Sequence, residues 1–101
     1  MIKKQFLKSK PVAKVTFSLP AEAAPEAQEV KLVGEFSEWT KSPIEMKKLK
    51  NGSFKTTIDL EVGKEYEFRY IIDGDKWEND WEADAYRSNQ VTYEENSVVS
   101  L

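Results

Sequence analysis

Apolar and polar residues alternate along most of the chain, and this pattern predicts β-strands. The alternation is clear over residues 15–19 and 54–60 and is strongest over residues 66–72. Because successive side chains of a strand point to opposite faces, each segment has one buried face and one solvent-facing face. The residues expected on the buried faces are Val15, Phe17, Leu19, Val30, Leu32, Phe54, Thr56, Ile58, Leu60, Tyr66, Phe68, Tyr70 and Ile72.

Turn signals separate these segments. The pair Asn51-Gly52 predicts a hairpin whose two-residue turn has both residues at positive φ. Asp73-Gly74-Asp75 predicts a second tight turn, and Gly34 marks a bulge or a close approach of the backbone. Residues 21–28 are rich in alanine, but Pro25 interrupts them and no apolar stripe develops, so we expect a loop there.

Six or seven short strands with turns between them predict an all-β fold, an antiparallel β-sandwich. With 101 residues the chain is long enough for one domain, residues 1–101, within which we expect residues 1–11 to be loosely ordered. Residues 79–87 are the local exception to the strand pattern. There Asn79 is suited to cap a single turn of helix, with Glu82 three residues further on.

The composition narrows the classes of function. The chain is 40% apolar and 33% charged, which is typical of a soluble globular protein. It contains neither cysteine nor histidine. These absences remove disulfides, thiol nucleophiles, the commonest general base near neutral pH and the two commonest ligands of transition metals. We therefore expect a protein that is not an enzyme and that uses no cofactor and no metal ion.

Charge and hydropathy bear on partners and location. The net charge of −3 argues against a nucleic-acid partner. Five of the first fourteen residues are lysine, whereas residues 59–84 carry ten acids against three basic residues, and the simplest interpretation is a lopsided solvated surface. No export signal and no long apolar window occur, so we expect a cytoplasmic protein without a membrane partner.

Two of the three tryptophans lie in an acidic stretch, residues 73–84. Its acids superficially match an EF-hand calcium loop, but a glutamate stands where that loop needs glycine. A rigid exposed indole suits stacking on the apolar face of a sugar. Trp39, Trp77 and Trp81 supply such rings, and Arg69 supplies a hydrogen-bond donor. Three alternatives stay open: an indole fills the core, Trp81 packs under its loop, or Arg69 is a cross-strand partner of a glutamate.

Several motifs occur in a fixed order along the chain. G-x-F-x-x-W spans residues 34–39, a hairpin and an aromatic strand ending in D-G at residues 73–74 follow, Trp77 comes next, and N-S-V-V spans residues 96–99. In this combination the chain resembles, over about residues 12–101, the isoamylase N-terminal-like, family-48 carbohydrate-binding modules. This group includes the glycogen-binding domain of the AMP-activated protein kinase β subunit. The resemblance implies an early-set immunoglobulin-like antiparallel β-sandwich of about seven strands.

The resemblance also implies a ligand and a site. Members of that family that bind carbohydrate bind α-1,4-glucans such as glycogen, starch or maltooligosaccharides, without catalysis. The resemblance implies that Trp39 and Trp77 stack on glucose rings and that Arg69 and Asn96 form hydrogen bonds with sugar hydroxyls, arginine standing where the kinase-type modules have lysine. The alternative is a protein-interaction or regulatory β-sandwich that has lost sugar binding and associates with a glucan-metabolising enzyme in trans.

Overall fold

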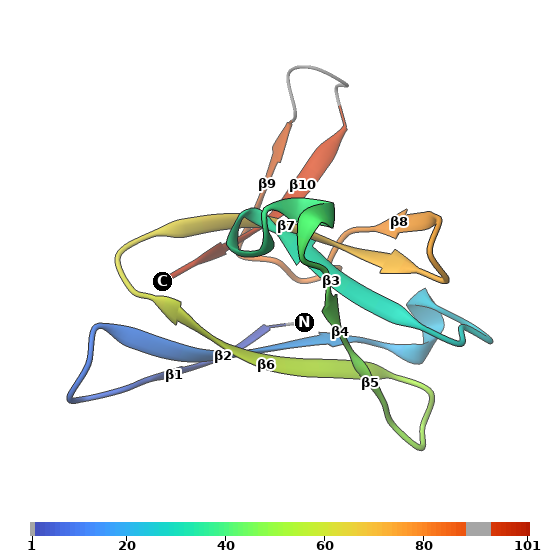
Figure 1. Ribbon diagram of the computed structural model, residues 1–101, viewed down its shortest axis with the longest axis horizontal. Helices are drawn as coiled ribbons and strands as arrows, with labels where there is room; N and C mark the ends of the chain where they lie inside the picture. Colours follow the sequence, from blue (N-terminus) through green and yellow to red (C-terminus); the bar gives the residue numbers. More distant parts are fainter. Residues whose placement is uncertain (1, 89–93) are drawn as a thin grey trace.

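Two antiparallel β-sheets stack face to face in a sandwich (Figure 1). The computed structural model describes residues 2–88 and 94–101. The four-stranded sheet has the order β1-β2-β6-β5, and the six-stranded sheet has the order β4-β3-β7-β10-β9, with β8 also paired to β7. This arrangement confirms the predicted all-β, immunoglobulin-like antiparallel sandwich.

The strands are β1 (Ile2–Phe6), β2 (Val12–Leu19), β3 (Val30–Gly34), β4 (Ile44–Glu45), β5 (Lys47–Lys48), β6 (Phe54–Glu61), β7 (Glu65–Ile72), β8 (Lys76–Glu78), β9 (Ala85–Ser88) and β10 (Glu95–Ser100). Three 3-10 turns connect them: η1 (Ala21–Ala23), η2 (Glu35–Ser37) and η3 (Trp39–Lys41). In the part of the chain that the structure describes, no helix is long and apolar enough to cross a membrane.

The predicted alternation places the core between the two sheets. Val15, Phe17 and Leu19 of β2 are fully buried, as are Phe68 and Tyr70 of β7. The rings of Phe17 and Phe68 meet edge to face with their centroids 4.9 Å apart. Contacts of this kind between rings add to the free energy of burying apolar area, so β2 and β7 hold the two sheets together.

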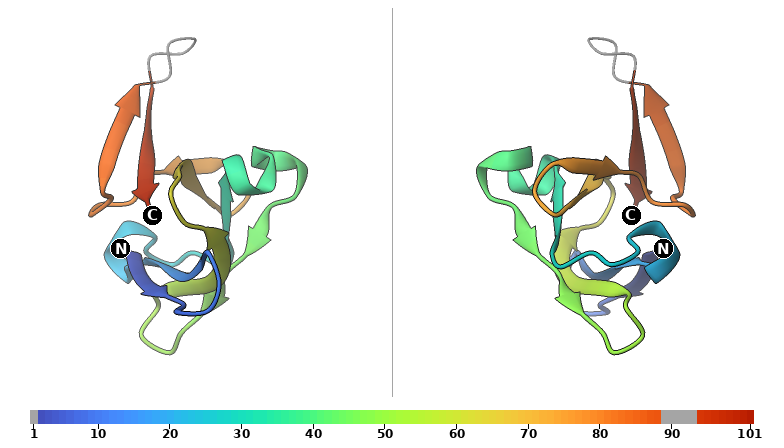
Figure 2. Two further views of the ribbon diagram at one scale, coloured as in Figure 1. Left: turned by 90° about the vertical axis from the view of Figure 1, so that its left-hand side faces the viewer. Right: turned by 90° about the vertical axis from the view of Figure 1, so that its right-hand side faces the viewer.

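Strand β7 organises the outer face of the six-stranded sheet. On one side it pairs with β3, which places Val33 opposite Arg69. On its other side it pairs with β10 near Phe68 and with β8 near Ile71. Strands β8 and β10 therefore lie end to end along β7, and their outward-facing side chains meet around Arg69. Strand β9 and the start of β10 extend beyond the body of the sandwich (Figure 2).

Local details differ from the expectations at three places. Residues 2–6 were expected to be loosely ordered but form β1, which pairs with β2 along its full length; the lysines at positions 3 and 4 hide its alternation. The hairpin at Asn51-Gly52 is present, but only Gly52 has positive φ, because Lys50 enlarges the loop to three residues. The described residues form ten strands rather than about seven, since β4, β5 and β8 are pieces of two or three residues.

Candidate functional site

The four residues singled out from the sequence line one depression on the outer face of the six-stranded sheet. Trp39, Arg69, Trp77 and Asn96 all border it, although they come from four separate parts of the chain. The depression is open to solvent and has a volume of about 850 Å³. Its other lining residues are Thr40, Asn79, Glu94 and Glu95.

Apolar side chains form the floor beneath this depression. Val33 and Ile71 are buried although they point away from the core. Trp77 stands directly opposite Ile71 in the strand register. Facing side chains of paired strands have Cβ atoms about 5 Å apart, so Trp77 and Ile71 are close neighbours on this face of the sheet. Trp77 nevertheless stays 44% exposed, and this exposed part of the ring is available to a ligand.

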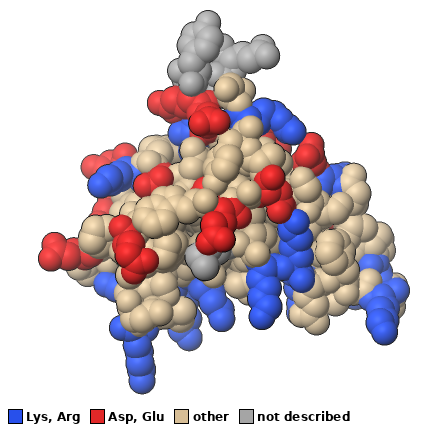
Figure 3. Space-filling model, turned by 180° about the vertical axis from the view of Figure 1, so that it is seen from behind, with Lys and Arg blue, Asp and Glu red and all other residues tan. Residues whose placement is uncertain are grey.

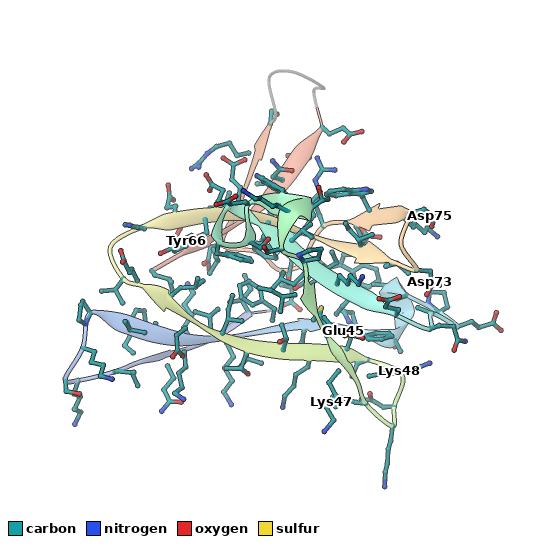
Figure 4. The ribbon with its side chains drawn as sticks, viewed as in Figure 1. Glu45, Lys47, Lys48, Tyr66, Asp73 and Asp75 are labelled. Carbon is teal, nitrogen blue, oxygen red and sulfur yellow. The ribbon has the colours of Figure 1, made fainter. Side chains whose placement is uncertain are left out.

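A tight turn at the tip of the β7–β8 hairpin fixes the position of Trp77 in the sheet. The turn predicted for Asp73-Gly74-Asp75 is present, and Asp73 and Gly74 have positive φ, at 51° and 83°. The Asp73 carboxylate also accepts two backbone N–H groups of the loop before β3, at 2.9 and 3.0 Å. Figure 4 shows Asp73 and Asp75 at this end of the hairpin. The turn is thus tied to a neighbouring loop.

A left-handed backbone carries Trp39 to the depression. Glu38 and Trp39 have φ of 51° and 58°, a conformation that costs a residue with a Cβ atom about 1 kcal/mol. The Ser37 hydroxyl accepts the Gly34 N–H at 3.1 Å and donates to the Trp39 carbonyl at 2.9 Å, which holds this backbone in place. A Cβ atom added to Gly34 would lie 2.6 Å from the carbonyl oxygen of Glu67, so the predicted close approach is confirmed.

The guanidinium of Arg69 is fixed by three contacts. Its Nε–H donates to Asn96 Oδ1 at 2.6 Å, its Nη1 donates to the Glu94 carboxylate at 3.0 Å, and its Cζ lies 5.6 Å from the ring centre of Trp77. The side chain is only 11% exposed. Arg69 thus has a glutamate partner, but Glu94 precedes β10 and is not the cross-strand glutamate of the alternative interpretation. The remaining N–H groups of the guanidinium have no acceptor among the described residues, so they are free to donate to a ligand.

Asn96 is nearly buried, at 5% exposure, and both ends of its amide are engaged. Its Oδ1 accepts from Arg69, and its Nδ2 donates to Glu67 at 2.9 Å. Glu67 in turn lies 3.6 Å from the guanidinium of Arg87. The amide therefore connects Arg69 to a polar network on the sheet, and its main effect is to fix the direction of that guanidinium.

A buried carboxylate anchors the loop after β8. Asp80 is 1% exposed, accepts the Tyr70 hydroxyl at 2.7 Å and accepts the Glu82 N–H at 2.8 Å. Burial, together with the Asp80 carboxylate, raises the pKa of Tyr70 well above its usual value, so the hydroxyl remains a donor. The bond from Asp80 to Glu82 closes an Asx-type turn, and residues 79–87 therefore form no helical turn, in contrast to the expectation.

Trp81 is 52% exposed and does not line the depression. The alternative that Trp81 packs under its loop is wrong. The carboxylate of Asp80 already occupies the buried position beneath that loop, and the indole that follows it lies at the surface. Trp81 is thus an exposed tryptophan outside the site, which makes it a matched control for the other two.

Sequence reasoning missed Thr40, Asn79, Glu94 and Glu95, which complete the lining of the depression. Each is adjacent to, or two positions from, a predicted site residue, so proximity along the chain was the available signal. Exposed polar residues are abundant in this chain, and nothing in their type separates these from the others. Among the described residues, no group of three acidic side chains is arranged to hold a metal ion.

The chain matches the profile of a known family. The match covers residues 9–87, and the family is described as carbohydrate-binding module 48, the isoamylase N-terminal domain. The chain belongs to this family. Carbohydrate is therefore the class of ligand that the family assigns to this module. The match includes Trp39, Arg69 and Trp77 and ends before Asn96, which joins the site through the pairing of β10 with β7.

A solved structure has a similar fold. It is a candidate alpha amylase from Salmonella typhimurium, with a TM-score of 0.60 and 17% sequence identity. The similarity covers 96% of this family-48 module and 14% of that protein, so the module spans a small part of that protein's length. At this level of identity the likeness concerns the fold alone. A comparison with curated proteins finds no match.

Proposed function

We propose that this module binds α-1,4-glucans such as glycogen, starch or maltooligosaccharides, and that it does so without catalysis. The observation that carries the proposal is the position of two indoles, Trp39 and Trp77, at one open depression next to an immobilised arginine. Neither indole belongs to the cluster of residues that fills the core. Trp77 is exposed and Trp39 is half-buried. Two accessible indoles next to a fixed hydrogen-bond donor match the alternation of apolar faces and hydroxyl edges on a glucose chain.

The expected affinity is modest. If each indole covers about 100 Å² of apolar sugar surface, stacking contributes about 2.5 kcal/mol per ring before the costs of association. Two rings and a few hydrogen bonds then leave about 4 to 7 kcal/mol, which corresponds to dissociation constants from about 1 mM to about 10 μM. Binding of this strength becomes useful on a polymer, because a glucan offers many overlapping sites to one module.

The polar residues take different roles in this proposal. Arg69 donates to sugar hydroxyls through the N–H groups that no described residue accepts. Asn96 supports it, because its amide binds Arg69 and Glu67 and the residue is only 5% exposed, so little of its surface can touch the sugar. Glu94 and Glu95 supply carboxylate acceptors at the rim. In this proposal the module acts in the cytoplasm, where it brings a glucan to a glucan-metabolising enzyme.

The test is a titration with maltoheptaose followed by tryptophan fluorescence. The double variant Trp39→Ala with Trp77→Ala should lose binding and retain its unfolding free energy to within about 1 kcal/mol, since both rings lie outside the core cluster. The matched control is Trp81→Ala, which removes an exposed indole outside the depression and should bind like the parent. Cellohexaose, whose β-1,4 chain is straight, should bind more weakly than the curved α-linked oligosaccharide.

A saturable signal that persists in the double variant would contradict the assignment of the site. Absence of any binding by the folded parent at about 10 mM maltoheptaose, a limit near 3 kcal/mol, would contradict the function itself. In that second case, retention on a column of a glucan-metabolising enzyme would favour the alternative of a protein-interaction module.

A further inference from the structure

Basic residues of this chain divide into two groups by the presence of a carboxylate partner. Those with an acidic partner within 4.0 Å are Lys4, Lys31, Lys41, Lys64, Arg69 and Arg87. Nine lysines of the described residues have no such partner, and seven of these lie on the outer face or in the turns of the four-stranded sheet. These seven, called the lysine face below, are Lys3, Lys8, Lys10, Lys14, Lys47, Lys50 and Lys55. The other two are Lys48, whose ammonium donates to the Ala27 carbonyl, and Lys76 of β8 in the other sheet.

The strand register places this group on the side of the sheet that faces away from the core. Lys14 of β2 lies opposite Asp59 of β6, and Lys3 of β1 lies opposite Thr16. Lys47 of β5 lies directly opposite Lys55 of β6, although like charges at facing positions destabilise a sheet. Figure 4 shows Lys47 beneath the lower sheet, and in Figure 3 lysine and arginine side chains project along the lower border of the molecule.

The lysine face is strongly positive, whereas the rest of the protein is strongly negative. Among the outward acids of the same strands, Glu61 already pairs with Lys64, so Asp59 alone opposes the seven lysines. The face thus carries an excess of six positive charges, in a chain whose net charge is −3, and the remainder carries −9. Neighbouring strands are about 4.8 Å apart, less than the Debye length of about 8 Å at physiological salt, so lysines at facing positions reinforce one another.

The chemistry of the face selects the kind of partner. It has no arginine and no aromatic side chain, and at its centre the hydroxyls of Thr16 and Thr57 bond to each other at 2.9 Å. Stable protein interfaces are enriched in aromatic residues and arginine and are depleted of lysine. A layer of anionic headgroups needs neither an apolar anchor nor a groove, and it attracts each nearby lysine.

We propose that the lysine face docks this module on the surface of a bilayer that contains anionic phospholipids. The expectation of no membrane partner rested on the absence of an apolar span, and peripheral contact through lysines requires no such span. The acidic remainder of the molecule is repelled by the same surface, which orients the module. The depression with Trp39 and Trp77 lies on the outer face of the opposite sheet and stays accessible, so lipid and glucan bind independently.

The experiment is co-sedimentation of the full chain with vesicles of phosphatidylcholine, either alone or with about 30 mol % phosphatidylglycerol. The parent should sediment with the anionic vesicles, should not sediment with the neutral ones, and should be released when the salt is raised from about 50 to about 500 mM. The triple variant Lys14→Gln, Lys47→Gln, Lys55→Gln should partition about 100-fold less. Its matched control, Lys31→Gln, Lys41→Gln, Lys76→Gln, changes the net charge equally and should partition like the parent.

Three results would overturn the proposal: no sedimentation with anionic vesicles at low salt, equal losses in the two triple variants, or tighter binding to polyglutamate or to duplex DNA at equal charge concentration. If the face variant fails to fold, the single changes at Lys14 and Lys47 each test the same prediction, with an expected loss of about fivefold. Maltoheptaose binding should be the same in the face variant and the parent, so failure of lipid docking and failure of glucan binding are distinguishable.

Discussion

Replacing Asn96 by alanine tests whether the polar network behind Arg69 stabilises the protein and the site. The change removes the acceptor of the Arg69 Nε–H, at 2.6 Å, and the donor to Glu67, at 2.9 Å. Hydrogen bonds to charged groups contribute about 1.5–3 kcal/mol each, and this arginine is only 11% exposed. Water will form hydrogen bonds with Arg69 and Glu67 in place of some of those removed. We therefore expect the unfolding free energy to fall by about 2–3 kcal/mol and the Tm by roughly 10–15 °C.

Urea denaturation followed by tryptophan fluorescence measures this change in stability. The affinity for maltoheptaose should also fall about tenfold, because Asn96 no longer holds the guanidinium of Arg69 in place. A second pair of variants reverses the polarity of one bond. Asn96→Asp keeps the acceptor for Arg69 but places a carboxylate against Glu67, and adding Glu67→Gln restores a donor at that position. The double variant should be more stable than Asn96→Asp alone. A loss below about 0.5 kcal/mol for Asn96→Ala, or no recovery in the double variant, would refute this description of the network.

Three further predictions concern the fold around the site. Gly34→Ala should lower the free energy of unfolding, measured by urea denaturation, by several kcal/mol, because the added Cβ would lie 2.6 Å from a backbone carbonyl oxygen of β7. Asp80→Ala should lower the free energy of unfolding by about 3 kcal/mol, because the buried Tyr70 hydroxyl then keeps only the Ser18 carbonyl, at 3.5 Å, as an acceptor. Amide hydrogen exchange should show loss of protection in the loop after β8. Partial burial raises the pKa of Asp84, but hydrogen bonds from the Lys4 ammonium and a backbone N–H lower it by more. The ionised Asp84 carboxylate thus stabilises the fold above pH ~4, and this stabilisation is lost as the pH falls through the lowered pKa. Asp84→Asn should therefore weaken the dependence of the unfolding free energy on pH in this acidic range.

The alternation of side chains was sufficient to predict the sandwich, because burial on one face of a strand is a local property of the sequence. Val15, Phe17 and Phe68 lie in the core as their spacing indicates. Strand β1 was not predicted, because Lys4 occupies one of its inward positions and breaks the alternation of apolar and polar residues. The Lys4 ammonium instead forms an ion pair with Asp84 at 2.7 Å. An ion pair between residues so distant in sequence leaves no periodic signal.

The members of the candidate site were predictable, but their mutual contacts were not. Trp39, Arg69, Trp77 and Asn96 follow from the resemblance, and the structure places them at one depression. That the amide of Asn96 is occupied by its neighbours depends on the pairing of β10 with β7, which is a long-range property. The gathering of seven lysines without carboxylate partners on the outer face of one sheet likewise becomes visible only when the strand register is known.

The most direct measurement for the central claim is an NMR titration of the indole N–H signals with maltoheptaose. The chain has three tryptophans and therefore gives three such signals, which single Trp→Ala variants assign. The signals of Trp39 and Trp77 should shift together along one saturable curve, while that of Trp81, exposed but outside the depression, stays in place. A shift confined to Trp81, or no shift of either Trp39 or Trp77 in the folded protein at saturating sugar, would contradict the account.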